Sequence, residues 1–193
     1  QRNQERTYKL ETVSENVRQA IFAFNGDVYT GLDAYSISKE KYDILNEKVR
    51  ILSGLYGILK PFDLIEPYRL EMGKKLEVGE TTNLYQIWKP LITDFLNKEM
   101  EKDEVLVNLA STEYFNAVDT KKLKSRLITP EFKELKDDKL KIVSFFAKKA
   151  RGLMARFIIE ENIQNVEDLK MFNIEGYSFS EENSTENKLI FTR

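Results

Sequence analysis

The sequence predicts a mixed α/β protein, in which strands and helices alternate within one domain. Three stretches support this prediction. In residues 139–159 a mostly buried strand is expected to run directly into a helix, with the change to helical spacing at Ala147. Residues 104–109 form a short apolar strand, and residues 83–100 have the apolar spacing of an amphipathic helix. At 193 residues the chain is long enough for a single domain with a sizeable core.

The N-terminal part is predicted to contain two helices. Residues 1–12 are polar and are expected to be flexible, and the absence of an initiating Met suggests an N-terminally incomplete chain. Ser14 is a suitable N-cap for a first helix that ends at residues 25–27, and Ser38 begins a second helix. Residues 28–32, which lie between the two, are expected to be extended or to form a turn.

Two glycines three positions apart follow the second helix, in the sequence SGLYG (residues 53–57). This pattern resembles the turn of a helix-hairpin-helix module, where glycine lets the backbone approach a DNA phosphate closely. It also fits a tight turn that packs against the core. Gly-x-x-Gly alone does not distinguish these two interpretations.

The middle of the chain offers candidate polar residues in two motifs. Arg69 and Glu71 alternate with apolar residues, so an extended backbone projects both from one face, where they pair with each other or one engages a substrate. After the strand at 104–109, Ser111 is a candidate N-cap and Glu113 lies in the first helical turn. Such a junction holds ligands in many α/β sheets, although ordinary capping also explains it.

The C-terminal elements are predicted from apolar spacing and turn residues. Residues 127–135 are expected to form a strand interrupted by Pro130, and Asp137-Asp138 a turn into the strand that begins at Lys139. Further along, the pattern predicts a short helix and two strands, at residues 166–172, 177–179 and 188–191.

Basic residues concentrate in one region, because residues 120–159 contain 12 Lys or Arg and four Asp or Glu, while the whole chain has a net charge of −2. Lys148, Lys149 and Arg151 fall near the start of the expected helix, and Arg156 follows. Cations at a helix N-terminus cost about 0.3–1 kcal/mol each. Either a ligand anion such as phosphate offsets this cost, or the protein's own carboxylates do so, or the side chains extend into solvent.

The composition excludes several function classes. The sequence has no Cys and no His, which removes disulfides, thiol chemistry, Ser-His-Asp triads and the usual zinc sites. No apolar run is long enough to span a membrane and no signal peptide is visible, so we expect a soluble cytoplasmic protein without a membrane partner.

Taken together, residues 50–73, 108–118 and 145–159 resemble the bacterial peroxide-stress protein YaaA family, and residues 20–32 and 175–193 support the resemblance. The chain departs from the family in lacking its initial strand and Ser-Pro-Ala-Lys turn. In addition, Trp88-Lys89-Pro90 replaces the usual Trp-Gly-Asp. The missing segment contributes to the sheet and the cleft in the family, so the set of site residues in this chain is incomplete.

The resemblance implies a mixed β-sheet core surrounded by helices, a helix-hairpin-helix-like element and a positively charged cleft. It further implies binding to double-stranded or branched DNA, and an association with limiting intracellular iron during peroxide stress. The DNA- or anion-binding candidates are Ser53, Gly54, Tyr56, Gly57, Arg69, Lys148, Lys149, Arg151 and Arg156. No cofactor is expected, because direct iron binding without His or Cys requires a carboxylate cage and none is evident in the sequence.

The alternative hypothesis is an enzyme that acts on a small anionic or nucleotide-like substrate. Its pocket would be lined by Arg69, Glu71, Glu113, Lys148 and Arg151, which come from separate motifs. Arg and Lys would bind the anion, and Glu71 or Glu113 would transfer a proton. The sequence does not predict the oligomeric state.

Overall fold

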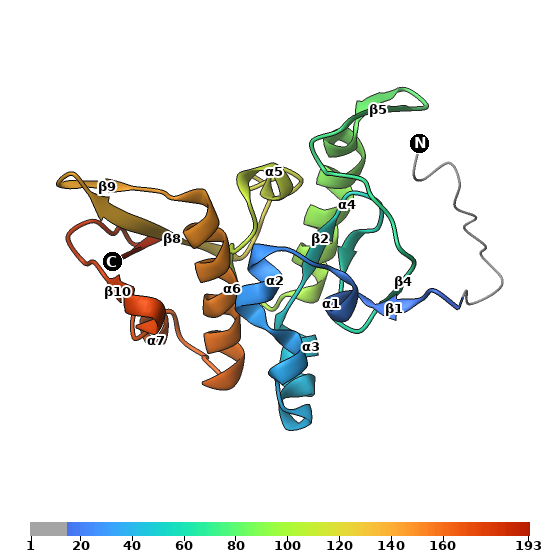
Figure 1. Ribbon diagram of the computed structural model, residues 1–193. Helices are drawn as coiled ribbons and strands as arrows, with labels where there is room; N and C mark the ends of the chain where they lie inside the picture. The colour runs from blue at the N-terminus through green and yellow to red at the C-terminus, as the bar shows by residue number, and fades with distance from the viewer. Residues whose placement is uncertain (1–14) are drawn as a thin grey trace.

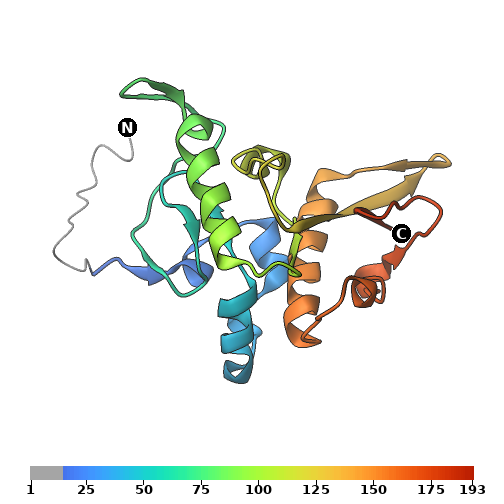
Figure 2. The same cartoon turned by 180° about the vertical axis from the view of Figure 1, so that it is seen from behind.

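A computed structural model describes residues 15–193 and confirms the mixed α/β class (Figure 1). The expectations for residues 1–12 and for Ser14 lie outside the described residues. Helix α6 (Ser144–Glu160) lies in the middle of the molecule, between α2 (Asp27–Leu32) on one side and strand β8 (Arg126–Lys136) on the other, in both views (Figures 1 and 2).

The first half of the described chain contains short elements and one long helix. These are β1 (Arg18–Gln19), α1 (Ala20–Ala23), α2, the 3₁₀ turns Ala34–Ser36 and Lys39–Lys41, α3 (Tyr42–Lys48), β2 (Ile51–Ser53), β3 (Gly57–Leu59), β4 (Leu64–Ile65), β5 (Lys75–Val78), β6 (Thr81–Asn83) and α4 (Leu84–Glu99). The predicted helix at 83–100 is therefore confirmed as α4, and the Asn83 side chain caps it by accepting a hydrogen bond from the Gln86 N–H.

The second half builds the largest sheet. Its elements are β7 (Val105–Val107), α5 (Thr112–Phe115), β8, β9 (Lys139–Lys141), α6, α7 (Val166–Leu169), the 3₁₀ turn Ile174–Gly176, β10 (Ser178–Phe179) and β11 (Lys188–Thr192). The strand order is β10-β11-β8-β7, and β9 pairs with β8 beyond the end of β7. Strands β7 and β11 run parallel to β8, whereas β9 and β10 are antiparallel to their neighbours, which makes the sheet mixed.

Strand β8 continues through Pro130, and the predicted interruption there is wrong. The N–H groups of Thr129 and Leu135 point toward β11, where they bond the carbonyls of Asn187 and Arg193. The N–H groups of the alternate residues between them point to the opposite edge of β8. On that edge β7 pairs with residues 126–128 and β9 with residues 134–136, so the position of Pro130, which has no N–H, faces neither strand. Proline therefore removes no ladder hydrogen bond at this position.

Two predicted segments in the N-terminal part differ from the structure. Residues 28–32 belong to helix α2 rather than to an extended segment. The first predicted helix is reduced to α1, because the N–H groups of Ala20 and Ile21 bond the carbonyls of Asp63 and Pro61 instead. Both differences arise from contacts with residues far away in the sequence, which the local spacing of apolar residues cannot predict.

The helix-hairpin-helix prediction is also corrected, because the SGLYG turn joins two antiparallel strands, β2 and β3, rather than two helices. Ser53 pairs with Gly57 across the turn, and Gly57 adopts a φ of +76°, which glycine tolerates better than other residues. The turn is therefore a β-hairpin, and helix α3 ends at Lys48 before strand β2 begins.

Helices α2 and α6 touch through their backbones at two glycines. A Cβ atom placed on Gly152 would lie 1.9 Å from the Val28 carbonyl oxygen, and one on Gly31 would lie 2.1 Å from the Lys149 carbonyl oxygen. On its other face, α6 packs Ala150 against the sheet residues of the C-terminal core. The two glycines thus fix the distance between α6 and the N-terminal half.

A buried ionic group ties the C-terminal strand to the sheet. The Glu134 side chain accepts hydrogen bonds from the Tyr177 hydroxyl and from Arg193 Nε, at 2.8 Å for the closer Arg193 contact. The Arg193 guanidinium also lies over the rings of Tyr177 and Phe146. Burial alone raises the pKa of Glu134, but the hydrogen bonds from Tyr177 and Arg193 outweigh it and hold the pKa below the usual 4.5.

This group predicts an acid-dependent loss of stability. A carboxyl whose pKa is lowered by folding stabilises the protein above its unfolded-state pKa, and this contribution is lost as the pH falls through the lower folded-state pKa. We expect Glu134→Gln to reduce the free energy of unfolding by about 2 kcal/mol at pH 7, because a hydrogen-bonded charge is lost. The difference from wild type should shrink steadily below pH 4.5 in urea titrations at several pH values.

The control for this measurement is Glu181→Gln, which changes an exposed carboxyl without a described ion pair. It should leave stability nearly unchanged at every pH. An equal difference between wild type and Glu134→Gln at pH 7 and pH 3 would contradict the description of Glu134 as ionised and hydrogen-bonded.

Candidate nucleic-acid interface

The polar groups of the β2–β3 turn are used within the protein. Ser53 is fully buried, and its hydroxyl oxygen accepts a hydrogen bond from the Tyr56 N–H at 3.0 Å. The same oxygen lies 2.6 Å from the Tyr68 hydroxyl. The Tyr56 hydroxyl in turn accepts a hydrogen bond from the Glu66 N–H. These bonds fix the shape of the turn and its position against the segment that follows β3.

Both glycines of this turn are packed closely against other parts of the chain. A Cβ atom on Gly54 would lie 2.3 Å from the Leu70 carbonyl oxygen, and one on Gly57 would lie 2.6 Å from the Trp88 ring. The Trp88 indole N–H also donates to the Gly54 carbonyl at 2.9 Å. This packing accounts for both glycines without a ligand, and the binding of a phosphate by this turn stays a prediction.

Three tyrosines meet beside the turn: Tyr29 from α2, Tyr114 from α5 and Tyr68 from the segment after β4. Burial raises the pKa of the Tyr29 hydroxyl, and the neighbouring hydroxyls of Tyr68 and Tyr114 raise it further. Phe24 completes this group, because it stacks on Tyr29 and meets Tyr68 edge to face. Sequence reasoning missed Tyr29 because residues 28–32 were expected to be extended or to form a turn, not a helix that faces this group.

The candidates Arg69, Glu71 and Glu113 lie around this tyrosine group. Arg69 forms an exposed ion pair with Glu71 at 3.5 Å. Glu113 follows the predicted cap Ser111, and its carboxylate accepts a hydrogen bond from the Gly73 N–H at 2.9 Å. Burial raises the pKa of Tyr114, and the charges of Glu113 and Glu71 add to the increase. Two motifs that are about 40 residues apart therefore converge at Tyr114.

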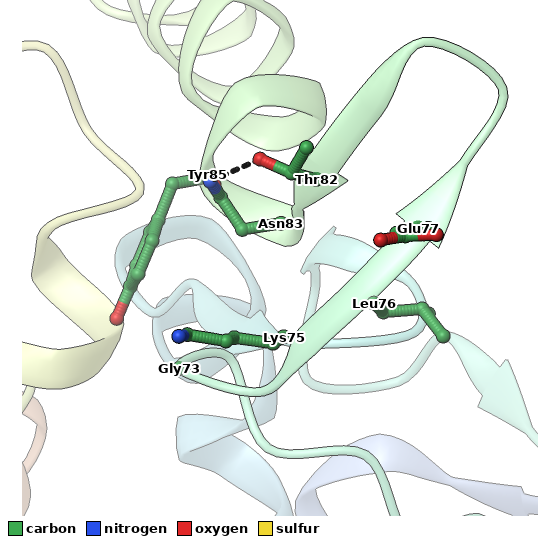
Figure 3. A pocket seen from close by; sticks show the side chains of 7 residues that line it. All are labelled: Gly73, Lys75, Leu76, Glu77, Thr82, Asn83 and Tyr85. Atoms are coloured by element: carbon green, nitrogen blue, oxygen red, sulfur yellow. Dashed lines mark hydrogen bonds between the residues drawn. The ribbon is translucent and has the colours of Figure 1, made fainter.

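An open groove borders this region (Figure 3). Its lining comes from the β5–β6 hairpin and the start of α4, namely Gly73, Lys75, Leu76, Glu77, Thr82, Asn83 and Tyr85. Figure 3 shows the Lys75 ammonium group and the Tyr85 hydroxyl extending to one side, with Leu76 and Glu77 on the other. The Tyr85 hydroxyl donates to the Glu113 carbonyl at 2.8 Å, so the groove adjoins the tyrosine group, but none of the five residues predicted for an enzyme pocket lines it.

Two of the four basic candidates on α6 have carboxylate partners within the chain. Lys149 forms an ion pair with Glu175. Arg156 forms an ion pair with Glu160 at 2.8 Å and donates hydrogen bonds to the Asp33 carbonyl and to Ser36. Arg156 therefore holds the turn after α2, which is a structural role.

The other two basic candidates, Lys148 and Arg151, form no ion pair with a carboxylate of residues 15–193. Lys148 is exposed. Arg151 is half-buried, and burial lowers the pKa of its guanidinium; its Nε–H makes only a long 3.4 Å contact with the Ala147 carbonyl. Helix α6 begins at Ser144, so the predicted continuation of the buried strand to Ala147 is wrong, and Lys148 and Arg151 lie in the second turn of the helix. The first turn has no acidic residue, and its N-cap Val143 offers no side-chain acceptor. This end of α6 is thus electropositive within the described chain.

Helix α2 connects the two groups of candidates. Gly31 on one face of α2 contacts α6, which carries the basic residues. Tyr29 on another face lies beside Tyr68 and Tyr114, near the acidic candidates. The short helix that the sequence did not predict is therefore the element that positions the two groups relative to each other (Figure 1).

Comparison with known proteins identifies the family to which the motifs at residues 50–73, 108–118 and 145–159 belong. The model of the family described as "Peroxide stress protein YaaA" matches residues 1–183. The chain belongs to this family. A UPF0246 protein of Flavobacterium johnsoniae is 60% identical over 192 residues, which cover all of this chain and 75% of the relative. UPF0246 proteins of Flavobacterium psychrophilum and Aliivibrio fischeri are each 58% identical, over 100% and 93% of this chain and 76% and 70% of the relatives.

Membership of the YaaA family confirms the resemblance and the link to peroxide stress through the family name. The names of the relatives state no ligand and no reaction. Among residues 15–193, no helix has the length and apolar character needed to cross a bilayer, and no group of three or more acidic side chains is placed to hold a metal ion.

Proposed function

We propose that this YaaA-family protein binds the phosphate backbone of double-stranded or branched DNA in the peroxide stress response. One observation carries the proposal: Lys148 and Arg151 lie near the start of an α6 helix whose first turn has no acid, and neither has a carboxylate partner in the described chain. Such a site favours an external anion, and DNA supplies phosphates at regular spacing.

The lysines of the β8–β9 hairpin extend this basic surface. Lys141 lies opposite Glu134 and forms an ion pair with Asp137 at 3.2 Å, whereas Lys136 and Lys139 are direct partners across the two strands. Like charges directly opposite each other destabilise an antiparallel pair, so this arrangement also favours a bound anion. Lys149 and Arg156 strengthen the local positive potential, although their own contacts are within the chain.

A titration of the purified protein against labelled DNA tests this function. Duplex, four-way junction and single-stranded DNA of matched sequence are each titrated at two salt concentrations, and fluorescence anisotropy gives the affinity. We expect tight binding that weakens steeply with salt, because binding to phosphates releases counterions. Absence of binding to all three forms at the lower salt concentration would rule the function out.

The proposal includes an association with limiting intracellular iron, and its dependence on DNA binding can be tested. In a strain that lacks the gene, wild-type protein should lower the chelatable iron measured by electron paramagnetic resonance after peroxide treatment. A variant that no longer binds DNA should fail to do so at equal protein level. Full activity of that variant would separate the iron effect from DNA binding.

The alternative, an enzyme for a small anionic substrate, is favoured by one observation. Glu71 and Glu113 both lie close enough to the Tyr114 hydroxyl to raise its pKa. A pair of carboxylates beside a phenol could transfer protons. This alternative also requires Lys148 and Arg151, which lie on α6, to share one pocket with the two glutamates. That shared pocket stays a prediction.

A further inference from the structure

Two aromatic side chains are exposed at the start of α6, beside the lysines of the β8–β9 hairpin. Phe145 is 58% exposed and Phe146 is 37% exposed, although aromatic side chains usually contribute to a core. Their rings contact each other, with centroids 5.6 Å apart and planes at 66°. An exposed aromatic pair next to basic residues calls for an explanation other than packing.

The sheet register places the lysines on one face of the hairpin, and contacts through Arg193 place the Phe146 ring at the same face. Glu134 on β8 lies opposite Lys141 on β9, and it also binds Arg193, whose guanidinium is 4.4 Å from the centre of the Phe146 ring. The residues at 134 and 136 share a face because side chains alternate along a strand. We call this surface the aromatic-lysine patch: Lys136, Lys139, Lys141, Phe145 and Phe146.

The rings of the patch differ in what they offer a ligand. One side of the Phe146 ring is already covered by the Arg193 guanidinium, which holds the ring in place. Phe145 is the more exposed of the two, and its ring contacts the ring of Phe146. A flat π surface fixed among lysines suits a ligand that has both a planar ring and a phosphate.

Three occupants of such a patch can be compared by charge. A membrane surface is disfavoured, because a wide anionic surface would also have to contact the exposed carboxylates of Asp137 and Asp138 at the turn of the hairpin, whereas a single strand can pass beside them. A second copy of the chain is disfavoured, because two surfaces rich in lysine repel each other. A single-stranded nucleic acid provides phosphates for the lysines and unpaired bases for the rings, whereas the bases of a duplex are already stacked.

We propose that the aromatic-lysine patch binds single-stranded DNA, with an unpaired base stacked on Phe145 and the flanking phosphates on Lys136 and Lys139. This inference rests on the proposed DNA-binding function and specifies which part of a branched or opened DNA the protein contacts. The duplex segment next to the unpaired base lies toward Lys148 and Arg151 at the start of α6.

Substitutions of Phe145 separate stacking from simple apolar contact. The probe is a fluorescein-labelled 20-nucleotide single strand, compared with the blunt duplex of the same sequence at one salt concentration. We expect Phe145→Ala and Phe145→Leu each to weaken single-strand binding about tenfold, since stacking of one base contributes that much, and to change duplex binding less than twofold. Leu64→Ala, which shortens an equally exposed side chain on β4, is the matched control and should change neither.

A tryptophan variant gives a second, independent measurement. The chain has a single tryptophan, Trp88, which packs on Gly57. Phe145→Trp should keep or increase the single-strand affinity, and the unlabelled strand should quench its added fluorescence, whereas the fluorescence of wild type should stay constant. A blue shift on vesicles of phosphatidylcholine and phosphatidylserine, without quenching by DNA, would overturn the proposal in favour of a lipid site.

The outcomes distinguish this inference from the function on which it depends. If Phe145→Leu binds the single strand as tightly as wild type, or if Phe145→Ala weakens the duplex equally, stacking on Phe145 is excluded while DNA binding stands. If wild type binds neither DNA form, both proposals fail. Selective loss of single-strand binding in both variants supports the inference.

Discussion

Replacing Gly152 by alanine is expected to lower the free energy of unfolding by about 3 kcal/mol, near the upper end of what overpacking costs. In an exposed helix the same change stabilises by about 1 kcal/mol, because alanine has the higher helix propensity. Here the sign reverses, since the added methyl group would lie 1.9 Å from the Val28 carbonyl oxygen of α2. That neighbour is backbone and cannot rotate away, so the two helices must move apart.

Urea denaturation followed by the fluorescence of Trp88 measures this effect. Trp88 belongs to the core around α4, so its signal reports unfolding beyond the α2–α6 contact. Ser144→Ala, at an exposed position of the same helix, serves as the control and should stay within about 0.5 kcal/mol of wild type. A Gly152→Ala variant that is as stable as wild type would show that α2 and α6 are not in backbone contact.

Reversing the charge of Lys148 is expected to have the largest effect on DNA binding among single substitutions. Lys148→Glu removes one phosphate contact and places a carboxylate at the electropositive start of α6. We expect the affinity for duplex DNA to fall about tenfold or more at 0.1 M salt, and the slope of log K against log salt to decrease by about 1. Because Lys148 is exposed and has no carboxylate partner in the described chain, the free energy of unfolding of the variant should differ little from that of wild type.

The matched control is Lys98→Glu, an exposed lysine near the end of α4. It changes the net charge equally, so an effect of total charge alone would weaken binding in both variants by the same factor. Arg151→Gln tests the second cation without burying a new carboxylate and should reduce affinity in the same direction. Lys149 and Arg156 are less informative, because reversing their charge also breaks ion pairs with Glu175 and Glu160.

The sequence predicted the elements whose signals are local. The amphipathic spacing of α4, the cap at Ser111 and the turn at Asp137-Asp138 were all identified correctly, and both Asp residues have the positive φ that such turns require. Each of these depends on residues within a few positions of one another. Local sequence signals therefore predicted these three features of the region around the candidate interface.

The parts that the sequence did not predict depend on contacts between distant residues. Helix α2 is only six residues long and forms because Gly31 lets it pack on α6, more than 100 positions away. The strands that flank Gly54 and Gly57 are too short for their alternation to be distinguished from helical spacing. Likewise, the partner of Lys149 became known only once Glu175 was placed in space, and so did the contact of Arg156 with Asp33, whereas the pair of Arg156 with Glu160 is local.

The parallel pairing of β11 with β8 has a consequence for synthesis of the protein on the ribosome. Thr129 and its partner Lys188 are separated by almost sixty positions, so β8 leaves the exit tunnel long before β11 exists. At about 5–20 residues per second, this interval lasts roughly 3–12 s. Throughout that time the nascent chain presents Phe132 and one free strand edge to its surroundings, which favours binding by chaperones that hold emerging polypeptides.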